Sequence, residues 1–392
     1  MAQIHTTHPD VQEQLPSLQV SLSRVGVTGV EKVIRIRANG AEQLYHANLD
    51  CFVDLGPDQK GAHMSRFEEV VNDVIGEVIL GEATFKAETL AQHIAEGVLD
   101  RQRARRAEVT IAARYPEHKP APESGIPTQE MYTLLGSAVA AASGTRRLIG
   151  VQAQGITACP CAQGLVEGRS RERLEVDGFS ADEIERIFHA VPVATHNQRG
   201  LGTLRVGCTE LCEDEIDAAV LLDIVEESMS SEIYELMKRS DEATVVEKAH
   251  RRPRFVEDCV REMIGAVVTQ LTGLSDAHFV SARQENLETI HQHNVVAERF
   301  GLLGEVRHEI DTGEHLPHHT SVREMIRGVL HRFPALADAA FVSARQENLE
   351  TIHQHNVMAE RFGTLGELRT ELRTGEPLAH HTPMRDWLDA LA

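Results

Sequence analysis

Seventeen consecutive residues of this 392-residue chain occur twice without a change. The segment FVSARQENLETIHQHNV extends from Phe279 to Val295 and again from Phe341 to Val357, an offset of 62 residues. A solenoid needs at least three stacked units to bury its core, so two copies indicate a tandem duplication. Residues 322–392 are therefore predicted to be a duplicate of residues 260–321 and beyond, with an accessory role.

Ahead of the repeat, the hydrophobic pattern predicts strands, then helices, then strands, in an order that occurs twice. Alternating apolar and polar residues predict strands at Leu18–Ser23, Glu31–Ala38, Tyr45–Leu55, Ala107–Tyr115, 146–156 and 202–208, and near Phe279 and Asn294. Helical periodicity predicts helices at Met64–Leu80, Lys86–Arg105, just after Ser180, 216–239 and 254–271. A proline-rich loop is expected at Pro116–Pro127. This order predicts an α+β fold of two like modules, with helices on one face of antiparallel sheets.

The length of the chain allows a large core and suggests two domains with an appendage. We expect a flexible N-terminal arm at residues 1–17, a first module at 18–145 and a second module at 146–315.

Composition excludes several classes of protein. The formal net charge of −21 argues against a general nucleic-acid binder, because phosphate contacts need clustered lysine and arginine. Six cysteines show no disulfide-framework spacing, and the polar first residues lack the apolar core of a signal peptide, so a cytoplasmic setting is expected. No apolar run approaches the length of a membrane span.

The sequence Cys159-Pro160-Cys161 places two thiols on a stiff bend after a strand-like stretch. Cysteines one residue apart rarely reach relaxed disulfide geometry, so a metal ligand beside a reactive thiol explains the pair better. For an isolated CPC, a pair of buried small side chains near a turn is about as good an explanation. Two other residues in distinctive strings, His196 in HNQRG and Glu242 in KRSDE, favour the metal. A thiolate, an imidazole and a carboxylate can hold one catalytic metal and leave a position open for water, which points to metal-assisted hydrolysis.

Six short strings together resemble the type IB GTP cyclohydrolases. They are HMSR (63–66), ACPC (158–161), HNQRG (196–200), KRSDE (238–242), FVED (255–258) and ENLETIHQHN (285–294). The HQHN form and the FVEDCVR context look most like the archaeal, Fe(II)-dependent branch. The resemblance covers roughly residues 18–310. The residues after it match the family only as a second copy of the preceding segment.

This resemblance implies a bimodular tunnelling fold that assembles as a homotetramer with active sites between subunits. It implies that GTP loses C8 of guanine as formate and becomes a 7,8-dihydroneopterin phosphate for pterin and folate biosynthesis. The archaeal members release a 2′,3′-cyclic phosphate, which is favoured here, and the bacterial members the triphosphate. One divalent metal per subunit is expected, with Fe(II) favoured and Mn(II) or Zn(II) as alternatives.

The resemblance also assigns roles to residues. Carried over by motif, Cys159, His196 and Glu242 match the metal ligands, and Glu257 matches the glutamate that anchors the purine. A carboxylate can accept hydrogen bonds from guanine N1 and N2, a donor pair that adenine lacks. The proton-transfer pair is matched by Glu288 and His291, and the second active-site thiol by Cys161. The candidates for the ribose and phosphates are His63, Ser65, Arg66, Gln198 and Arg199.

Two questions about the chain remain: how the long spacer is accommodated, and which copy of the repeat carries the catalytic string. The spacer from Cys161 to His196 is long, which leaves open how the chain returns to the metal. The catalytic string occurs in both copies, as Glu288 with His291 and as Glu350 with His353. The lead-in FVED favours the first copy, because the position aligned with Glu257 in the second copy is a histidine.

Two functions from other classes compete with this interpretation. One is a zinc or redox regulatory module in which four thiolates, Cys159, Cys161, Cys208 and Cys212, close a structural site. The other is a related tunnelling-fold enzyme that acts on a different pterin or purine.

Overall fold

A computed structural model describes residues 11–38, 41–78, 86–142, 144–208, 216–314, 341–347, 358–364, 369–370 and 373–374. Contacts divide the chain into two compact units, Met1–Arg307 and His308–Ala392. Within the described residues, no helix is long and apolar enough to cross a membrane.

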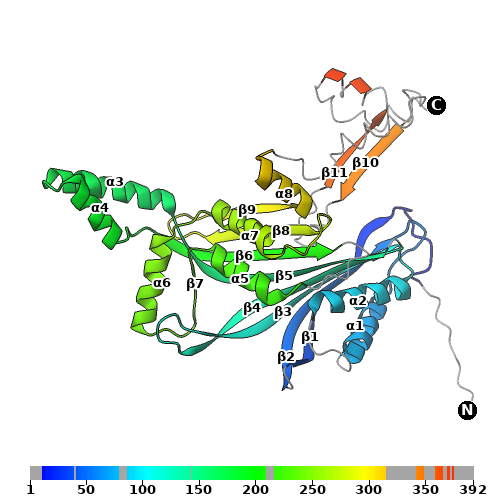
Figure 1. Ribbon diagram of the computed structural model, residues 1–392. Coiled ribbons are helices and arrows are strands. Elements are labelled where there is room, and N and C mark those ends of the chain that lie inside the picture. Colours follow the sequence, from blue (N-terminus) through cyan, green and yellow to red (C-terminus); the bar gives the residue numbers. More distant parts are fainter. Residues whose placement is uncertain are drawn as a thin grey trace, which may run out of the picture. The chain divides into compact units, whose positions relative to one another are not determined.

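The described elements ahead of the second copy form one antiparallel sheet with its helices (Figure 1). In chain order they are β1 (Leu22–Ala38), β2 (Ala41–Leu55), α1 (Met64–Val78), α2 (Ala87–Gln102), β3 (Arg106–Pro120), β4 (Pro127–Ala141), β5 (Gly144–Ala158), α3 (Pro160–Val176), α4 (Ala181–Ala190), β6 (Asn197–Cys208), α5 (Ala218–Ser228), β7 (Ser231–Glu232), α6 (Arg239–Arg251), α7 (Val256–Gln270), β8 (Phe279–Leu287), β9 (Val295–Leu302) and α8 (Leu303–Thr312). The strand order is β1-β2-β3-β4-β5-β6-β8-β9, and β7 pairs with β5.

The same sequence of elements occurs in both halves of the sheet. Two strands, two packed helices and two strands make up the first half, from β1 to β4. The second half repeats this plan with β5 and β6, then α5 and α7, then β8 and β9. The predicted α+β fold of two like modules, the tunnelling fold, is confirmed, although no observation tests the predicted domain boundaries.

Each half has its own hydrophobic core on the helix-covered face of the sheet. In the first half, Phe67 and Ile94 from the helices pack on strand residues such as Leu49. In the second half, Leu221 and Met263 pack on residues such as Leu204. Burial of such side chains supplies the main stabilisation, about 1.5–3 kcal/mol for each one.

The predicted helix 216–239 is wrong, because α5 ends at Ser228 and α6 begins only at Arg239. Between them, the buried Ser230 accepts a hydrogen bond from the backbone N–H of Ala158 (3.1 Å), which returns the chain to the sheet. Apolar residues recur at helical spacing past the end of α5, at Met229, Ile233 and Met237, so periodicity alone gives no stop signal there.

Two other segments of the structure also differ from the prediction. Helix α3 was not predicted, because it buries no side chain and therefore has no apolar stripe. The expected loop Pro116–Pro127 is shorter, since β3 continues to Pro120 and leaves residues 121–126 as the turn. Beyond Ala113, β3 pairs with β4 alone, so prolines cost the sheet little there.

The smaller unit contains β10 (Phe341–Glu347) and β11 (Met358–Thr364), which pair antiparallel. Phe341 lies opposite Thr364, and its counterpart Phe279 lies opposite Leu302 in the β8–β9 pair. Both partners are displaced by the same 62 residues, so the two copies form the same strand pairing. Glu350 and His353 lie outside the described residues.

Candidate active site

Cys159 and His196 lie side by side although 37 positions separate them in the sequence. The β5–β6 pairing ends at Ala158 opposite Asn197. One residue further on, the backbone N–H of Cys159 donates to the carbonyl of His196 (3.1 Å). The hydroxyl of Thr195 also donates to the carbonyl of Cys159 (2.9 Å). Helices α3 and α4 are therefore an insertion that leaves and re-enters the sheet at one point, which accounts for the long spacer.

Cys159 is the N-cap of α3. Its backbone is extended, Pro160 occupies the first helical position, and the Sγ atom accepts from the backbone N–H of Ala162 (3.5 Å). The positive end of a helix favours negative charge, which suits a thiolate ligand. The side chain of Cys161 is exposed in the first turn of the same helix.

His196 presents a buried ring nitrogen that lacks a partner. Its Nδ1 atom has no hydrogen-bond partner among the described residues. A buried polar atom without a partner is costly, so such an atom calls for a ligand or a water molecule. A thiol and an imidazole nitrogen together suit a transition metal such as Fe(II) or Zn(II), so these two residues fit the predicted metal.

Glu242 is exposed in the first turn of α6, away from this pair. The far end of α6 approaches the pair, because a ring nitrogen of His250 lies 3.3 Å from the carbonyl of Thr195. Glu242 precedes His250 by eight residues, about 12 Å of helix. In the described part of the chain, no three His, Cys, Asp or Glu side chains form a metal-binding group. The structure thus joins two of the three predicted ligands, and the triad stays a prediction.

The helix that carries the predicted purine anchor, Glu257, begins close to this pair. The backbone N–H of Arg254 donates to the carbonyl of Ala158 (3.0 Å), which ties the start of α7 to the residue before Cys159. Glu257 follows in the first turn of α7 with an exposed side chain.

The predicted proton-transfer pair follows β8 at the same end of the sheet. Glu288 is partly buried, and the hydroxyl of the next residue, Thr289, donates to the carbonyl of Asn197 (3.2 Å). His291 is exposed and stacks on His293, with ring centroids 5.2 Å apart. Sequence reasoning gave no role to the two residues that make these connections, although Thr289 lies within ENLETIHQHN and Arg254 directly precedes FVED.

The predicted ribose and phosphate residues are divided between two places. Gln198 is buried beside Thr157 in the β5–β6 pairing, and Arg199 is exposed and donates to Gln154 (3.1 Å). His63, Ser65 and Arg66 lie at the start of α1, which packs on α2 and β1 in the first half. Figure 1 shows α1 and α3 at different ends of the sheet, so one chain does not bring these three residues to Cys159.

The alternative four-thiolate site does not fit the fold. Cys208 lies opposite Arg147 at the far end of β6, whereas Asn197 begins that strand beside Cys159. Eleven residues of strand span about 36 Å, far beyond the reach of a shared zinc ion. Cys212 lies outside the described residues.

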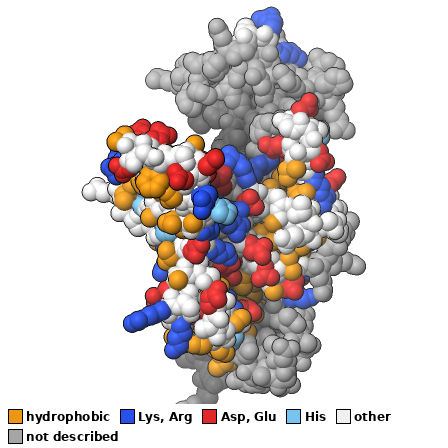
Figure 2. Space-filling model, turned by 60° about the vertical axis from the view of Figure 1, so that its left-hand side comes forward, with side chains coloured by type: hydrophobic (Ala, Val, Ile, Leu, Met, Phe, Trp, Pro, Cys, Tyr) orange, Lys and Arg blue, Asp and Glu red, His pale blue; other side chains and the backbone are white. Residues whose placement is uncertain are grey.

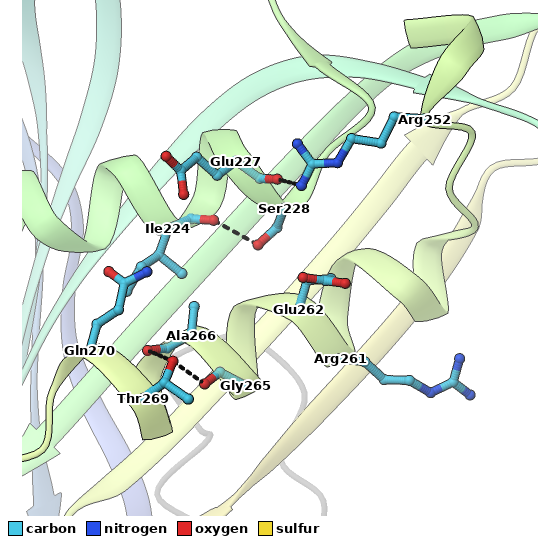
Figure 3. Close-up of a pocket in the computed structure, with 10 residues that line it drawn as sticks. All are labelled: Ile224, Glu227, Ser228, Arg252, Arg261, Glu262, Gly265, Ala266, Thr269 and Gln270. Carbon is cyan, nitrogen blue, oxygen red and sulfur yellow. Dashed lines mark hydrogen bonds between the residues drawn. The ribbon is translucent and has the colours of Figure 1, made fainter. Parts of the chain in front are cut away.

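A separate cavity of about 460 Å³ lies between α5 and α7 (Figure 3). The Arg252 guanidinium at its edge donates to the carbonyl of Glu227. Burial, together with the charge of nearby Arg254, lowers the pKa of Arg252. None of the predicted site residues lines this cavity. Figure 2 brings the α3, α4 and α6 side forward and shows acidic, basic and hydrophobic side chains intermixed there.

The fold and the site define an α+β enzyme with two like modules and a cysteine–histidine pair at one end of its sheet. A family model described as type I GTP cyclohydrolase folE2 matches residues 8–297. The chain belongs to this type I GTP cyclohydrolase family.

Individual relatives agree with the family match. The chain is 40% identical over 312 residues to the GTP cyclohydrolase MptA of Methanoculleus marisnigri, a match that covers 78% of this chain and 98% of that protein. It is 41% identical over 310 residues to the MptA of Methanothermobacter thermautotrophicus, covering 77% and 96%. Among solved structures, uricase from Arthrobacter globiformis matches 76% of this chain and 96% of its own, with 9% identity and a TM-score of 0.43.

Proposed function

We propose that this protein is a metal-dependent GTP cyclohydrolase. It hydrolyses the imidazole ring of guanine in GTP, releases formate, and forms a 7,8-dihydroneopterin phosphate, in preference the 2′,3′-cyclic phosphate. The observation that supports this most directly is the Cys159–His196 pair, with the unpartnered Nδ1 of His196 beside a thiol at a helix N-terminus. Membership of the family and two relatives named GTP cyclohydrolase MptA give the substrate.

We propose that Cys159, His196 and Glu242 hold one divalent cation, with Fe(II) favoured over Mn(II) or Zn(II). When bound, such a cation supplies Lewis-acid activation of water at neutral pH. Because Glu242 and the residues of α1 lie apart from Cys159 in one chain, we propose that the site is completed in a homo-oligomer, most simply the tetramer.

The other site residues bind substrate and move protons. Glu257 accepts hydrogen bonds from guanine N1 and N2 and so selects guanine over adenine. Glu288 and His291 transfer the protons that ring opening requires, and Cys161 supplies the second thiol of the site. Five residues, His63, Ser65, Arg66, Gln198 and Arg199, contact the ribose and phosphates.

The test is the product that the full chain forms from GTP under anaerobic Fe(II) and under Mn(II). Mass analysis should find formate and a dihydroneopterin phosphate, and the phosphate pattern separates the cyclic product from the triphosphate. We expect Cys159→Ala and His196→Ala to lose bound metal and activity together, by about 100-fold or more, because a ligand sets both metal affinity and water activation.

His189→Ala is the matched control, since this histidine is exposed on α4 and, among the described residues, Arg251 contacts its backbone carbonyl and not its side chain. Full activity in a metal-depleted Cys159→Ala or His196→Ala protein would remove the proposed site. Turnover of another pterin or purine instead of GTP would assign the protein to a different tunnelling-fold reaction.

A further inference from the structure

Asp241, the residue before the proposed ligand Glu242, is fully buried at the start of α6. Its Oδ1 atom accepts from the backbone N–H groups of Glu123 and Ser124, both at 2.8 Å. Its Oδ2 atom accepts from the hydroxyl of Ser124 and from the backbone N–H of Lys238, both at 2.7 Å. Four short bonds satisfy this carboxylate without any cation, so its role lies in the chain segments that it connects.

Those segments come from different halves of the fold. Glu123 and Ser124 belong to the turn between β3 and β4, in the first half, whereas α6 belongs to the second. The turn is closed by its own bonds, because the N–H of Ala121 donates to the carbonyl of Ile126 (2.9 Å). Gly125 takes the left-handed backbone that this turn needs, with φ of 65°. A preformed turn thus offers two adjacent N–H groups to one carboxylate.

Two more buried carboxylates connect the same hairpin to the end of α5 and to the segment that leads from α5 into α6. Glu226 accepts from the ammonium of Lys119 (2.6 Å) and from the hydroxyl of Tyr132 (2.7 Å). Glu130 accepts from the backbone N–H of Glu235 (2.9 Å). The β3–β4 hairpin is therefore held at three points along residues 226–241, and Asp241 is the point nearest to Glu242.

We propose that Asp241 is a positioning residue for the metal: by bonding to the β3–β4 turn, it sets the place and direction of the first turn of α6 and so of Glu242. This inference rests on the proposed function, in which Glu242 is a ligand. Glu242 is exposed, so its own side chain has no packing to orient it. Within the described part of the chain, its backbone is what is fixed, because its N–H donates to the carbonyl of Lys238 (3.0 Å). A ligand that is displaced by about 1 Å binds metal poorly.

A second aspartate provides the matched control. Asp258 occupies the third position of α7, as Asp241 does in α6, and accepts from the N–H of its N-cap residue Phe255 (3.0 Å). It also forms an ion pair with Arg261 of the same helix (3.3 Å). Asp258 therefore caps a helix locally, whereas Asp241 also bonds to a turn more than a hundred residues away.

The experiment measures the dissociation constant of Mn(II) for the full-length protein by competition with a chelator. We expect Asp241→Asn to raise that constant about 10- to 100-fold, as loss of groups that orient metal ligands does. Ser124→Ala, which removes one of the four bonds, should raise it less, and Asp258→Asn should leave it unchanged. Activity of Asp241→Asn should recover at saturating Mn(II), which a general loss of folding would not allow.

Glu242→Gln distinguishes a failure of the positioning role from a failure of the proposed ligand set. If Glu242→Gln loses Mn(II) while Asp241→Asn and Ser124→Ala bind it normally, the positioning role is wrong and the proposed ligand set stands. If Glu242→Gln itself binds Mn(II) normally, the ligand set is wrong and the positioning role fails with it. Should Asp241→Asn not fold, Ser124→Ala and Thr244→Val carry the test, since Thr244 donates to Glu123 of the same turn (3.1 Å).

Discussion

The thiols of this chain differ in what their surroundings allow them to do. Cys51 and Cys259 are fully buried, and burial raises the pKa of each to about 12. Cys161 is exposed and Cys159 partly so, at the end of the sheet where His196 lies. Of these four described thiols, only Cys161 and Cys159 can present a sulfur atom to a ligand or a reagent.

We expect iodoacetamide at pH 8 to alkylate Cys161 and metal-free Cys159, and to leave Cys51 and Cys259 unmodified. The thiolate is the reacting form, and a thiol with a pKa of about 12 is almost wholly protonated at pH 8. Unfolding returns the pKa toward about 8.5, so all four should then react. Peptide mapping by mass spectrometry checks this. Modification of Cys51 in the folded protein at the rate of Cys161 would contradict the burial.

Glu257 should affect GTP affinity and not metal content. Its place at the start of α7 is tied to Ala158 through the backbone of Arg254, beside the cysteine–histidine pair but not part of it. We expect Glu257→Ala to weaken GTP binding by about 2–4 kcal/mol, the cost of losing a charged contact that the bound base would cover. Calorimetry with a slowly hydrolysed GTP analogue and metal analysis together test this. Unchanged affinity with full metal would mean that the purine is anchored elsewhere.

The packing of helices on the sheet shows what the pattern of residues could and could not predict. Strands and helices with clear periodicity, such as β8 and α7, lie within a few residues of their predicted positions. Helix α3 has no buried side chain, and the buried face of α6 consists of Asp241, Val245 and Ala249, of which the first is charged, so neither helix gave a clear apolar periodicity. The convergence of Cys159 with His196 depends on the β5–β6 pairing, a long-range contact that no local pattern encodes.

Close contact between α2 and β4 depends on Gly136. A Cβ atom there would lie 2.2–2.3 Å from the backbone of Ala87, where α2 begins. We expect Gly136→Ala to lower the free energy of unfolding by about 1–3 kcal/mol, because backbone atoms would have to move. Gly76→Ala in α1 is the control: nothing lies within 4 Å of its Cβ position, so alanine should stabilise this helix by about 0.5–1 kcal/mol. Urea unfolding curves measure both, and equal effects would contradict this account of the packing.

For the chain as a whole, the duplicated segment poses the main question. The two copies form strand pairs in the same register, so the local structure of β10 and β11 does not distinguish them from β8 and β9. The difference lies in the connections. β8 pairs with β6, and Thr289 next to Glu288 bonds to Asn197 beside His196. The first copy therefore already occupies the end of the sheet where the predicted ligands meet.

We accordingly expect a chain that ends at Gly313 to keep GTP-dependent formate release. Helix α8 ends at Thr312 and Gly313 takes a left-handed backbone with φ of 72°, so this truncation leaves the last helix of the main sheet complete. In the full chain, Glu288→Gln with His291→Ala should abolish the activity, because the proton-transfer pair of the first copy is lost. Formate assays on metal-loaded protein measure both.

The same double change in the second copy, Glu350→Gln with His353→Ala, is the matched control and should leave formate release unchanged. The substituted strings are identical in sequence, so a difference between the two variants comes from the surroundings of each copy, that is, from its flanking residues and its place in the assembled enzyme. If the truncated chain folds and binds metal but is inactive, or if the second pair proves essential, then the second copy supplies the proton-transfer residues. In that case β10 would have to take the place of β8 beside β6, an exchange that the identical strand sequences permit.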